Sequence, residues 1–170
     1  ALMRRAGRAV ARLALAVAPH AQRIWVVAGP GNNGGDGLDA AIHLHQAGKT
    51  VHVSLLADSA RLPADAADAL QRARNAGVPI STPLSDGAED WLPWPDSLGA
   101  HDLVIDALLG LGSRRAPAGM LGEAVNRINH CSAIVLAVDL PTGLDADAGW
   151  LDIPDTASRC VRADHTLSLL

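Results

Sequence analysis

Short apolar runs that alternate with amphipathic segments are the feature that most constrains how this chain can fold. The runs are rich in Val, Ile and Leu and lie at residues 24–28, 51–56, 103–106, 133–139 and 165–170. Helical patterns at about residues 38–47, 64–76 and 121–129 lie between them. Because most of the runs are continuously apolar, they indicate parallel strands that are buried on both faces. We therefore predict an α/β fold, a Rossmann-like three-layer α/β/α sandwich with a mostly parallel sheet.

The two ends of the chain and one internal stretch are less regular. Residues 1–18 are apolar with interspersed arginines, which favours an amphipathic helix over a signal peptide. Residues 79–100 are rich in proline and predict a strand stub followed by an irregular connection. With 170 residues we expect one domain over residues 1–170, and the apolar end at Leu170 indicates that it was cut from a longer chain.

Composition narrows the classes of partner. The formal net charge of -4 offers no electrostatic footprint for nucleic acid or an anionic membrane, so small molecules are the expected partners. No stretch is long and apolar enough to span a bilayer. Cys131 and Cys160 are too few for a disulfide framework or a zinc site, and we expect free thiols in a reducing, cytoplasmic setting.

A glycine-rich segment directly follows the first apolar run. It reads Gly29-Pro30-Gly31-Asn32-Asn33-Gly34-Gly35-Asp36-Gly37 and precedes the helix expected from residue 38. Such a loop lets a ligand approach the backbone, and the helix start would accommodate a pyrophosphate. The segment matches G-x-G-x-x-G, with Asp58 where a ribose-binding acid is expected, but that match alone is weak. A plain turn is the alternative, and Asp36 would repel a phosphate unless it capped the helix or paired with a cation.

Acidic side chains stand at the ends of the central strands. Asp106 ends the third run and Asp139 ends the fourth, while Asp36 lies in the glycine-rich segment. Because parallel strands end at one edge of the sheet, we expect the three acids to converge on one crevice. Such a cluster needs a cation, a shared proton or a positively charged substrate. Oxygens of Asn33 and Thr142 beside one carboxylate suit a large monovalent ion, although oxygen ligands also serve magnesium and calcium.

Three separated motifs together resemble the NAD(P)H-hydrate epimerase family, the amino-terminal epimerase domain of bifunctional NAD(P)H-hydrate repair enzymes. They are the segment Gly29 to Gly37, the segment Asp106-Ala107-Leu108-Leu109-Gly110 and the segment Asp139-Leu140-Pro141-Thr142-Gly143-Leu144-Asp145. The resemblance implies a Rossmann-like isomerase that epimerises the R and S forms of hydrated NADH and NADPH and feeds the S epimer to an ADP- or ATP-dependent dehydratase, fused or separate. The number of chains that associate stays open.

The resemblance also assigns site residues. It implies a potassium ion held by Asn33, Asp106 and Thr142, the last standing where a serine is usual. It implies substrate contacts from Asn32, Asn33, Gly34, Gly35 and Asp36, from Gly110, Leu111, Gly112, Ser113, Arg114, Arg115 and Ala116, and from Asp139. From the residues alone, Arg114 and Arg115 fit either a phosphate contact or a solvated turn. We hypothesise that Asp139 is the general acid/base at the hydroxyl-bearing ring carbon.

Two other functions fit parts of the pattern. An NAD-dependent oxidoreductase would bind the intact cofactor on the glycine-rich segment and hold its ribose with Asp58, but the sequence offers no catalytic His or Tyr-Lys pair and no second substrate domain. A non-catalytic nucleotide-binding module of the same fold would keep the cavity without turnover. The two acids at strand ends argue against a pure scaffold.

Overall fold

The computed structural model describes residues 2–82, 97–113, 116–145 and 160–169. The elements in chain order are α1 (Leu2–Val17), β1 (Arg23–Ala28), α2 (Asn32–Gln46), β2 (Thr50–Leu55), the 3-10 turn η1 (Ser59–Arg61), α3 (Ala64–Asn75), β3 (Ile80–Ser81), β4 (Leu103–Ala107), α5 (Met120–His130), β5 (Ile134–Val138) and β6 (His165–Leu167). The expected helix at the start of the chain is confirmed, and so is the strand stub after residue 79. The remainder of the irregular stretch lies largely outside the described residues.

The strands form one sheet in the order β3-β2-β1-β4-β5-β6, and each neighbouring pair is parallel. The first strand, β1, lies in the middle of the sheet. The chain then adds β2 and β3 on one side of β1 and returns to add β4, β5 and β6 on the other side. In register, Val26 of β1 lies between Val53 of β2 and Ile105 of β4. The order therefore reverses between β1 and β4, and ligands of open α/β sheets bind at the carboxyl ends of the strands at such a point.

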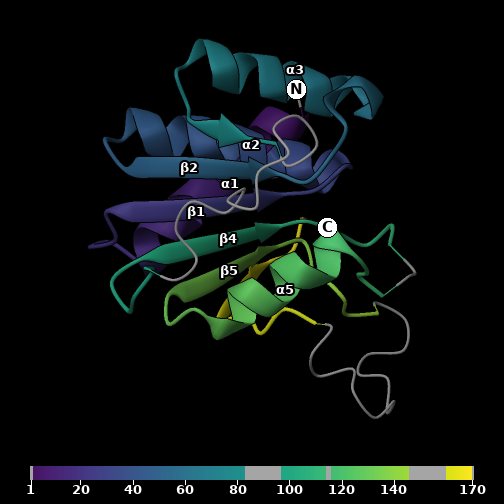
Figure 1. Ribbon diagram of the computed structural model, residues 1–170. Coiled ribbons are helices and arrows are strands. Elements are labelled where there is room, and N and C mark those ends of the chain that lie inside the picture. Colours follow the sequence, from purple (N-terminus) through teal and green to yellow (C-terminus); the bar gives the residue numbers. More distant parts are fainter. Residues whose placement is uncertain (1, 83–96, 114–115, 146–159, 170) are drawn as a thin grey trace.

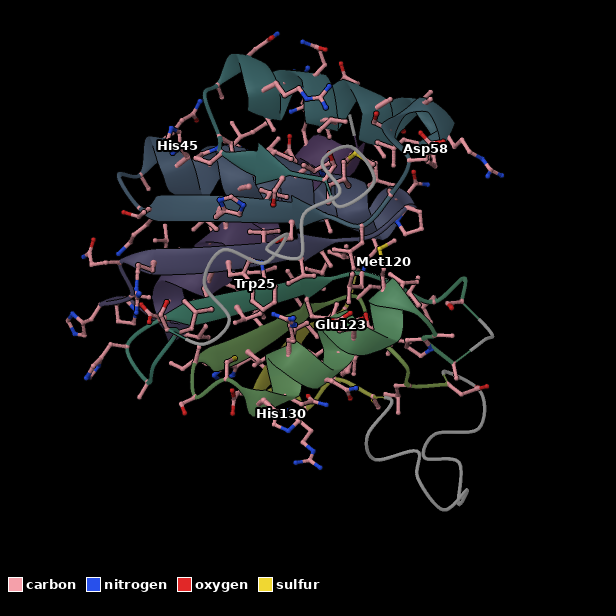
Figure 2. All side chains as sticks on the ribbon, in the orientation of Figure 1. Trp25, His45, Asp58, Met120, Glu123 and His130 are labelled. Atoms are coloured by element: carbon pink, nitrogen blue, oxygen red, sulfur yellow. The ribbon has the colours of Figure 1, made fainter. Side chains whose placement is uncertain are left out.

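Alternate residues of β1 pack into two different cores. Ile24 and Val26 belong to a cluster that is shared with α1, α2 and α3, while Trp25 and Val27 belong to a cluster that is shared with α5. Figure 1 shows α5 on one face of the sheet and α1 and α2 on the other. Trp25 is fully buried on the α5 side (Figure 2), and its indole N–H donates to Oγ of Ser54 at 2.9 Å. The expected three-layer α/β/α sandwich is confirmed.

The start of α2 corrects one expectation. The helix begins at Asn32 and not near residue 38, so the asparagines and most of the glycines of the glycine-rich segment are helical. The glycines allow close packing there, since a Cβ on Gly34 would overlap the carbonyl of Gly29 and a Cβ on Gly37 would lie 2.5 Å from Cβ of Ala107. Glycine is unfavourable inside a helix by about 1 kcal/mol relative to alanine, and tertiary packing overrides that preference here.

Smaller differences concern the last strand and the membrane. The strand expected at 165–170 ends at Leu167. Within the described residues, none of the helices has the length and apolarity needed to cross a bilayer. Cys131 and Cys160 are free thiols, as expected.

Candidate active site

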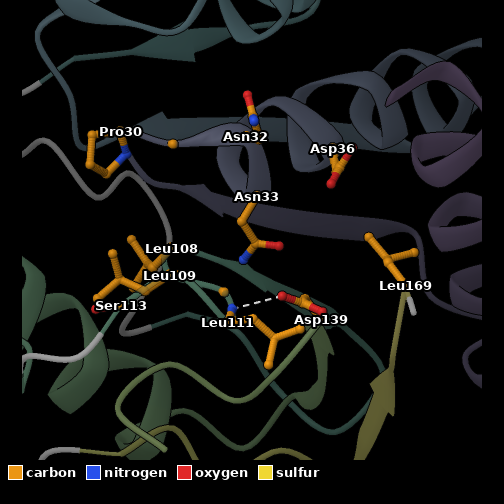
Figure 3. A pocket seen from close by; sticks show the side chains of 13 residues that line it. Pro30, Asn32, Asn33, Asp36, Leu108, Leu109, Leu111, Ser113, Asp139 and Leu169 are labelled. Atoms are coloured by element: carbon orange, nitrogen blue, oxygen red, sulfur yellow. Dashed lines mark hydrogen bonds between the residues drawn. The ribbon is translucent and has the colours of Figure 1, made fainter. Parts of the chain in front are cut away.

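A cavity of about 690 Å³ opens at the carboxyl edge of the sheet, beyond the ends of the neighbouring strands β1 and β4 (Figure 3). The amino-terminal turns of α2 form one wall, the loop after β4 forms a second, and the residue that follows β5 closes the third. The described residues that line it are Pro30, Gly31, Asn32, Asn33, Asp36, Leu108, Leu109, Gly110, Leu111, Gly112, Ser113, Asp139 and Leu169. A cavity of this size is ample for a small organic ligand.

The start of α2 offers backbone donors to the cavity. Gly31 is the N-cap residue and provides no side chain, and no side-chain hydrogen bond caps this helix. The first N–H groups of a helix have no partner inside the helix, and they sit at the positive end of its dipole. The wall near Asn32 is therefore suited to an anionic group of a ligand.

Asn33 holds an amide group with unsatisfied hydrogen-bonding capacity. Its Oδ1 and Nδ2 atoms are both buried, and neither has a hydrogen-bond partner among the residues that the structure describes. A Cβ on Gly110 would lie 3.4 Å from Cγ of Asn33 and 2.6 Å from Oδ2 of Asp139. The side chains of Asn33 and Asp139 therefore both approach the backbone of Gly110, where a larger residue would not fit. Leaving a buried amide unpaired costs free energy, and a bound ligand or ion would recover it.

Asp106 lies behind the cavity and not in it. It is fully buried in β4, and both of its oxygens accept hydrogen bonds. Oδ1 accepts from Oγ1 of Thr142 at 2.7 Å and from N of Leu108 at 3.2 Å, and Oδ2 accepts from N of Thr142 at 2.8 Å. Burial raises the pKa of Asp106 to about 6, and the hydrogen bonds from Thr142 and Leu108 oppose that rise.

Asp139 occupies an unusual backbone position directly after β5. Its φ of 69° lies in the left-handed region, and among the described non-glycine residues no other has a positive φ. The backbone N–H of Leu111 donates to its Oδ2 at 2.8 Å (Figure 3). A non-glycine residue in this conformation costs about 1–3 kcal/mol, and such strain is concentrated at functional sites.

Asp36 faces the cavity from the second turn of α2. Its pKa is raised to about 7, first by burial, then by the nearby charges of Asp39 and Asp139. It does not cap the helix, and it makes no ion pair with a cation in the described part of the chain. Within the described residues, neither arrangement expected to offset the negative charge of Asp36 is present, and it is the raised pKa that lowers this charge near neutral pH and so weakens the repulsion of a phosphate at the start of α2.

Most of the expected substrate-binding residues line the cavity. These are Asn32, Asn33, Asp36, Gly110, Leu111, Gly112, Ser113 and Asp139. Gly34 and Gly35 pack behind the wall, against Gly29 and against Met3 respectively, and Ala116 is exposed. Arg114 and Arg115 lie outside the described residues. Sequence reasoning missed Pro30, Gly31, Leu108, Leu109 and Leu169, whose side chains carry no chemical signal beyond being apolar or absent.

The expected convergence of three acids is wrong in part. Asp36 and Asp139 share the cavity, but Asp106 turns into the protein and binds Thr142. Among the residues that the structure describes, no three His, Cys, Asp or Glu side chains form a group able to hold a metal. Asp58, the acid expected to hold a ribose, caps η1 by accepting from N of Ala60 at 3.0 Å and does not line the cavity. Figure 2 shows Asp58 near one end of α3.

Known proteins that resemble this chain match it over almost its whole length. An NAD(P)H-hydrate epimerase of Rhodopirellula baltica is 38% identical over 167 residues, which cover 98% of this chain and 64% of that protein. A bifunctional NAD(P)H-hydrate repair enzyme of Thermofilum pendens is 36% identical over 167 residues, which cover 98% of this chain and 30% of that protein. The chain therefore spans less than two thirds of the length of either relative.

Fold and family comparisons agree with these relatives. The crystal structure of yeast ynu0 superposes with a TM-score of 0.79 at 25% sequence identity, covering 98% of this chain and 69% of that one. The family model described as "YjeF-related protein N-terminus" matches residues 1–170. The resemblance first drawn from three motifs is thereby confirmed, and the chain belongs to the YjeF-related protein N-terminus family.

Proposed function

We propose that this chain interconverts the R and S epimers of hydrated NADH and NADPH, and so acts as an isomerase in the repair of damaged cofactor. The observation that carries the proposal is the pair of carboxyl groups, Asp36 and Asp139, on one cavity whose wall is the start of α2. The names of the relatives from Rhodopirellula baltica and Thermofilum pendens support the choice of substrate.

The dinucleotide would lie across the carboxyl edge of the sheet. Its pyrophosphate would accept hydrogen bonds from the backbone N–H groups at the start of α2, next to Asn32, because Gly31 has no side chain to occupy these donors. The hydrated nicotinamide ring would then lie deeper, near Asp139 and the 110–113 loop. Leu108, Leu109 and Leu169 give this part of the cavity apolar walls that suit a ring.

Asp139 would act as general acid/base at the ring carbon that carries the hydroxyl group. Inversion requires that carbon to become planar, which happens when the hydroxyl leaves as water. The ring is then a cation, and a fixed carboxylate beside it stabilises the charge without having to reorganise. General acid–base catalysis of this kind contributes about 10²- to 10⁴-fold to the rate.

The proposal includes a potassium ion held by Asn33, Asp106 and Thr142. The donor set fits such an ion, because it consists of oxygen atoms with a single negative charge and includes the unpartnered Oδ1 of Asn33. The 108–110 backbone lies between the three residues, since N of Leu109 donates to Oγ1 of Thr142 and a Cβ on Gly110 would lie 3.4 Å from Cγ of Asn33. Such an ion would supply positive charge next to the anionic substrate.

We further propose a dehydratase partner that consumes the S epimer, fused or separate. The bifunctional name of the Thermofilum pendens relative supports a second activity in such proteins. A reducing, cytoplasmic setting is consistent with the free thiols Cys131 and Cys160.

The experiment starts from a mixture of R and S hydrates with a dehydratase that accepts only the S epimer. If this chain is an epimerase, its addition leads to complete consumption of both epimers, whereas the dehydratase alone leaves the R epimer behind. Asp139→Asn provides the matched control and should reduce kcat far more than it raises KM. If the R epimer persists when the wild-type chain is present, the proposed function is refuted.

The rival functions make different predictions. An NAD-dependent oxidoreductase would change the absorbance of intact NADH when carbonyl substrates are added, but the acid proposed to hold its ribose, Asp58, is engaged at η1. A non-catalytic module would bind the hydrate and leave the ratio of epimers unchanged.

A further inference from the structure

Two carboxyl groups from different elements line the cavity, and the mechanism proposed above uses only that of Asp139. We infer that Asp36 is a second catalytic residue, so that Asp36 and Asp139 transfer protons at opposite faces of the ring whose carbon is inverted. The inference rests on the proposed function, and it concerns how that reaction reaches both faces.

The two groups face the cavity from different sides. Asp36 belongs to α2, which follows β1, and Asp139 follows β5 on the far side of β4. In Figure 3, Asp36 projects from α2 above the cavity, while Asp139 lies below it beside Leu111. A flat ring held between α2 and the 110–113 loop would therefore expose one face to each carboxyl group.

Neither carboxyl group can easily do the work of both. Asp139 is held by the N–H of Leu111 and by its left-handed backbone, so its side chain has little freedom to reach around a ring. Asp36 is fixed to a helix that packs tightly through Gly34 and Gly37. A reaction that removes water from one face and adds it to the other needs a proton donor and a proton acceptor on different sides.

The surroundings of Asp36 suit a group that carries a proton. The structure gives it no hydrogen bond and no ion pair within the described residues, so its oxygens are available to a ligand. The charged groups near it are Asp39 of α2, Asp139 after β5, and Arg5 of α1 and Asp65 of α3, which share an adjoining cavity with Asp36. Burial and the charges of Asp39 and Asp139 raise the pKa of Asp36 to about 7, so both protonation states are populated near neutral pH.

The step can be written with its atoms in balance. The C–O bond of the ring hydroxyl breaks, its electron pair stays with oxygen, and Asp36 donates the proton that turns the leaving group into water. The ring nitrogen shares its lone pair with the carbon and carries the positive charge. A water molecule then adds to the opposite face and gives its proton to Asp139. In the reverse direction the two residues exchange roles, and solvent resets the protons.

Solvent labelled with ¹⁸O separates the two faces. A residue that serves one face should let one epimer lose and regain its hydroxyl group on that face, which exchanges the oxygen without inversion. We expect Asp36→Asn to retain exchange of one epimer, Asp139→Asn to retain exchange of the other, and inversion to fall about 10²- to 10⁴-fold in each. The wild-type chain should invert and exchange both epimers.

Controls keep this inference apart from the proposed function. Asp65→Asn changes a carboxyl group outside the main cavity and should leave inversion and exchange unchanged. Thermal unfolding of each variant checks that it is folded, and a blank without protein gives the spontaneous rate. Absence of inversion by the wild-type chain would refute the proposed function itself. With an active wild type, an Asp36→Asn variant that inverts at the normal rate, or two variants that exchange the same epimer, would overturn only the role of Asp36.

Discussion

Thr142 binds both oxygens of the Asp106 carboxylate, through its hydroxyl at 2.7 Å and through its backbone N–H at 2.8 Å. This double contact joins the end of β4 to the turn after β5 without any basic side chain. The same hydroxyl accepts the N–H of Leu109 at 3.1 Å, so the floor of the cavity depends on one threonine.

Thr142→Val should therefore destabilise the protein by about 1–3 kcal/mol, because the buried Asp106 carboxylate and the half-buried N–H of Leu109 each lose a partner while the side chain keeps its shape. Thr142→Ser retains the hydroxyl and should recover most of the loss. Urea denaturation of the three proteins gives the free energies of unfolding. Equal stability of the valine and serine variants would contradict the role of the hydroxyl.

Gly110→Ala should reduce turnover and leave the fold intact. The new Cβ would lie 2.6 Å from Oδ2 of Asp139, so the carboxylate that accepts the Leu111 N–H must move. Gly99→Ala is the matched control, since a Cβ there meets nothing within 4 Å and Gly99 does not line the cavity. The comparison is the epimerisation rate of the two variants at equal thermal stability, and a normal rate for Gly110→Ala would show that the position of Asp139 tolerates displacement.

Gly37→Ala should destabilise the protein by about 1–3 kcal/mol, although alanine is the better helix former. Its Cβ would lie 2.5 Å from Cβ of Ala107 in β4, and α2 would have to shift away from the sheet. Gly99→Ala, where a Cβ meets nothing within 4 Å, should change stability little. Chemical denaturation measures both, and a neutral Gly37→Ala would mean that α2 can move without loss.

Stability should fall as pH rises from about 4 to 7, owing to Asp36. Its pKa is about 7 in the folded protein, against an ordinary value of 3.8 for an aspartate side chain, so the folded state binds the proton more tightly in that interval and deprotonation costs stability. Asp36→Asn removes this contribution, and its melting temperature should exceed that of the wild type more at pH 8 than at pH 5. A pH-independent difference between the two proteins would contradict the raised pKa.

Potassium should raise the melting temperature through Asn33. A ligand that binds only the folded state stabilises it by mass action, so a series from low to high potassium chloride should raise Tm, with choline chloride as the ionic-strength control. Asn33→Ala removes the unpartnered Oδ1 and should abolish the difference between the two salts. The ion assignment fails if the wild type melts at the same temperature in both.

Hydrophobic patterning predicted the strands well, because strands buried on both faces leave continuous apolar runs such as that of β1. The start of α2 was mispredicted, since glycine has low helix propensity and the close approach of Gly37 to Ala107, which favours a glycine there, is long-range in sequence. The inward turn of Asp106 depends on which face of β4 it occupies and on the position of Thr142, neither of which a linear pattern reveals. The placement of Asp139 at the sheet edge was predicted, but its left-handed backbone was not.

That backbone has a consequence for how this protein can evolve. Glycine adopts a positive φ without steric cost, so Asp139→Gly would relieve the strain at φ 69° while removing the acid/base group. A single substitution would thus give a variant that is at least as thermostable as the parent but has no activity on the hydrates. Selection for stability alone would favour Asp139→Gly. Position 139 should therefore retain its aspartate only where catalytic turnover is also under selection.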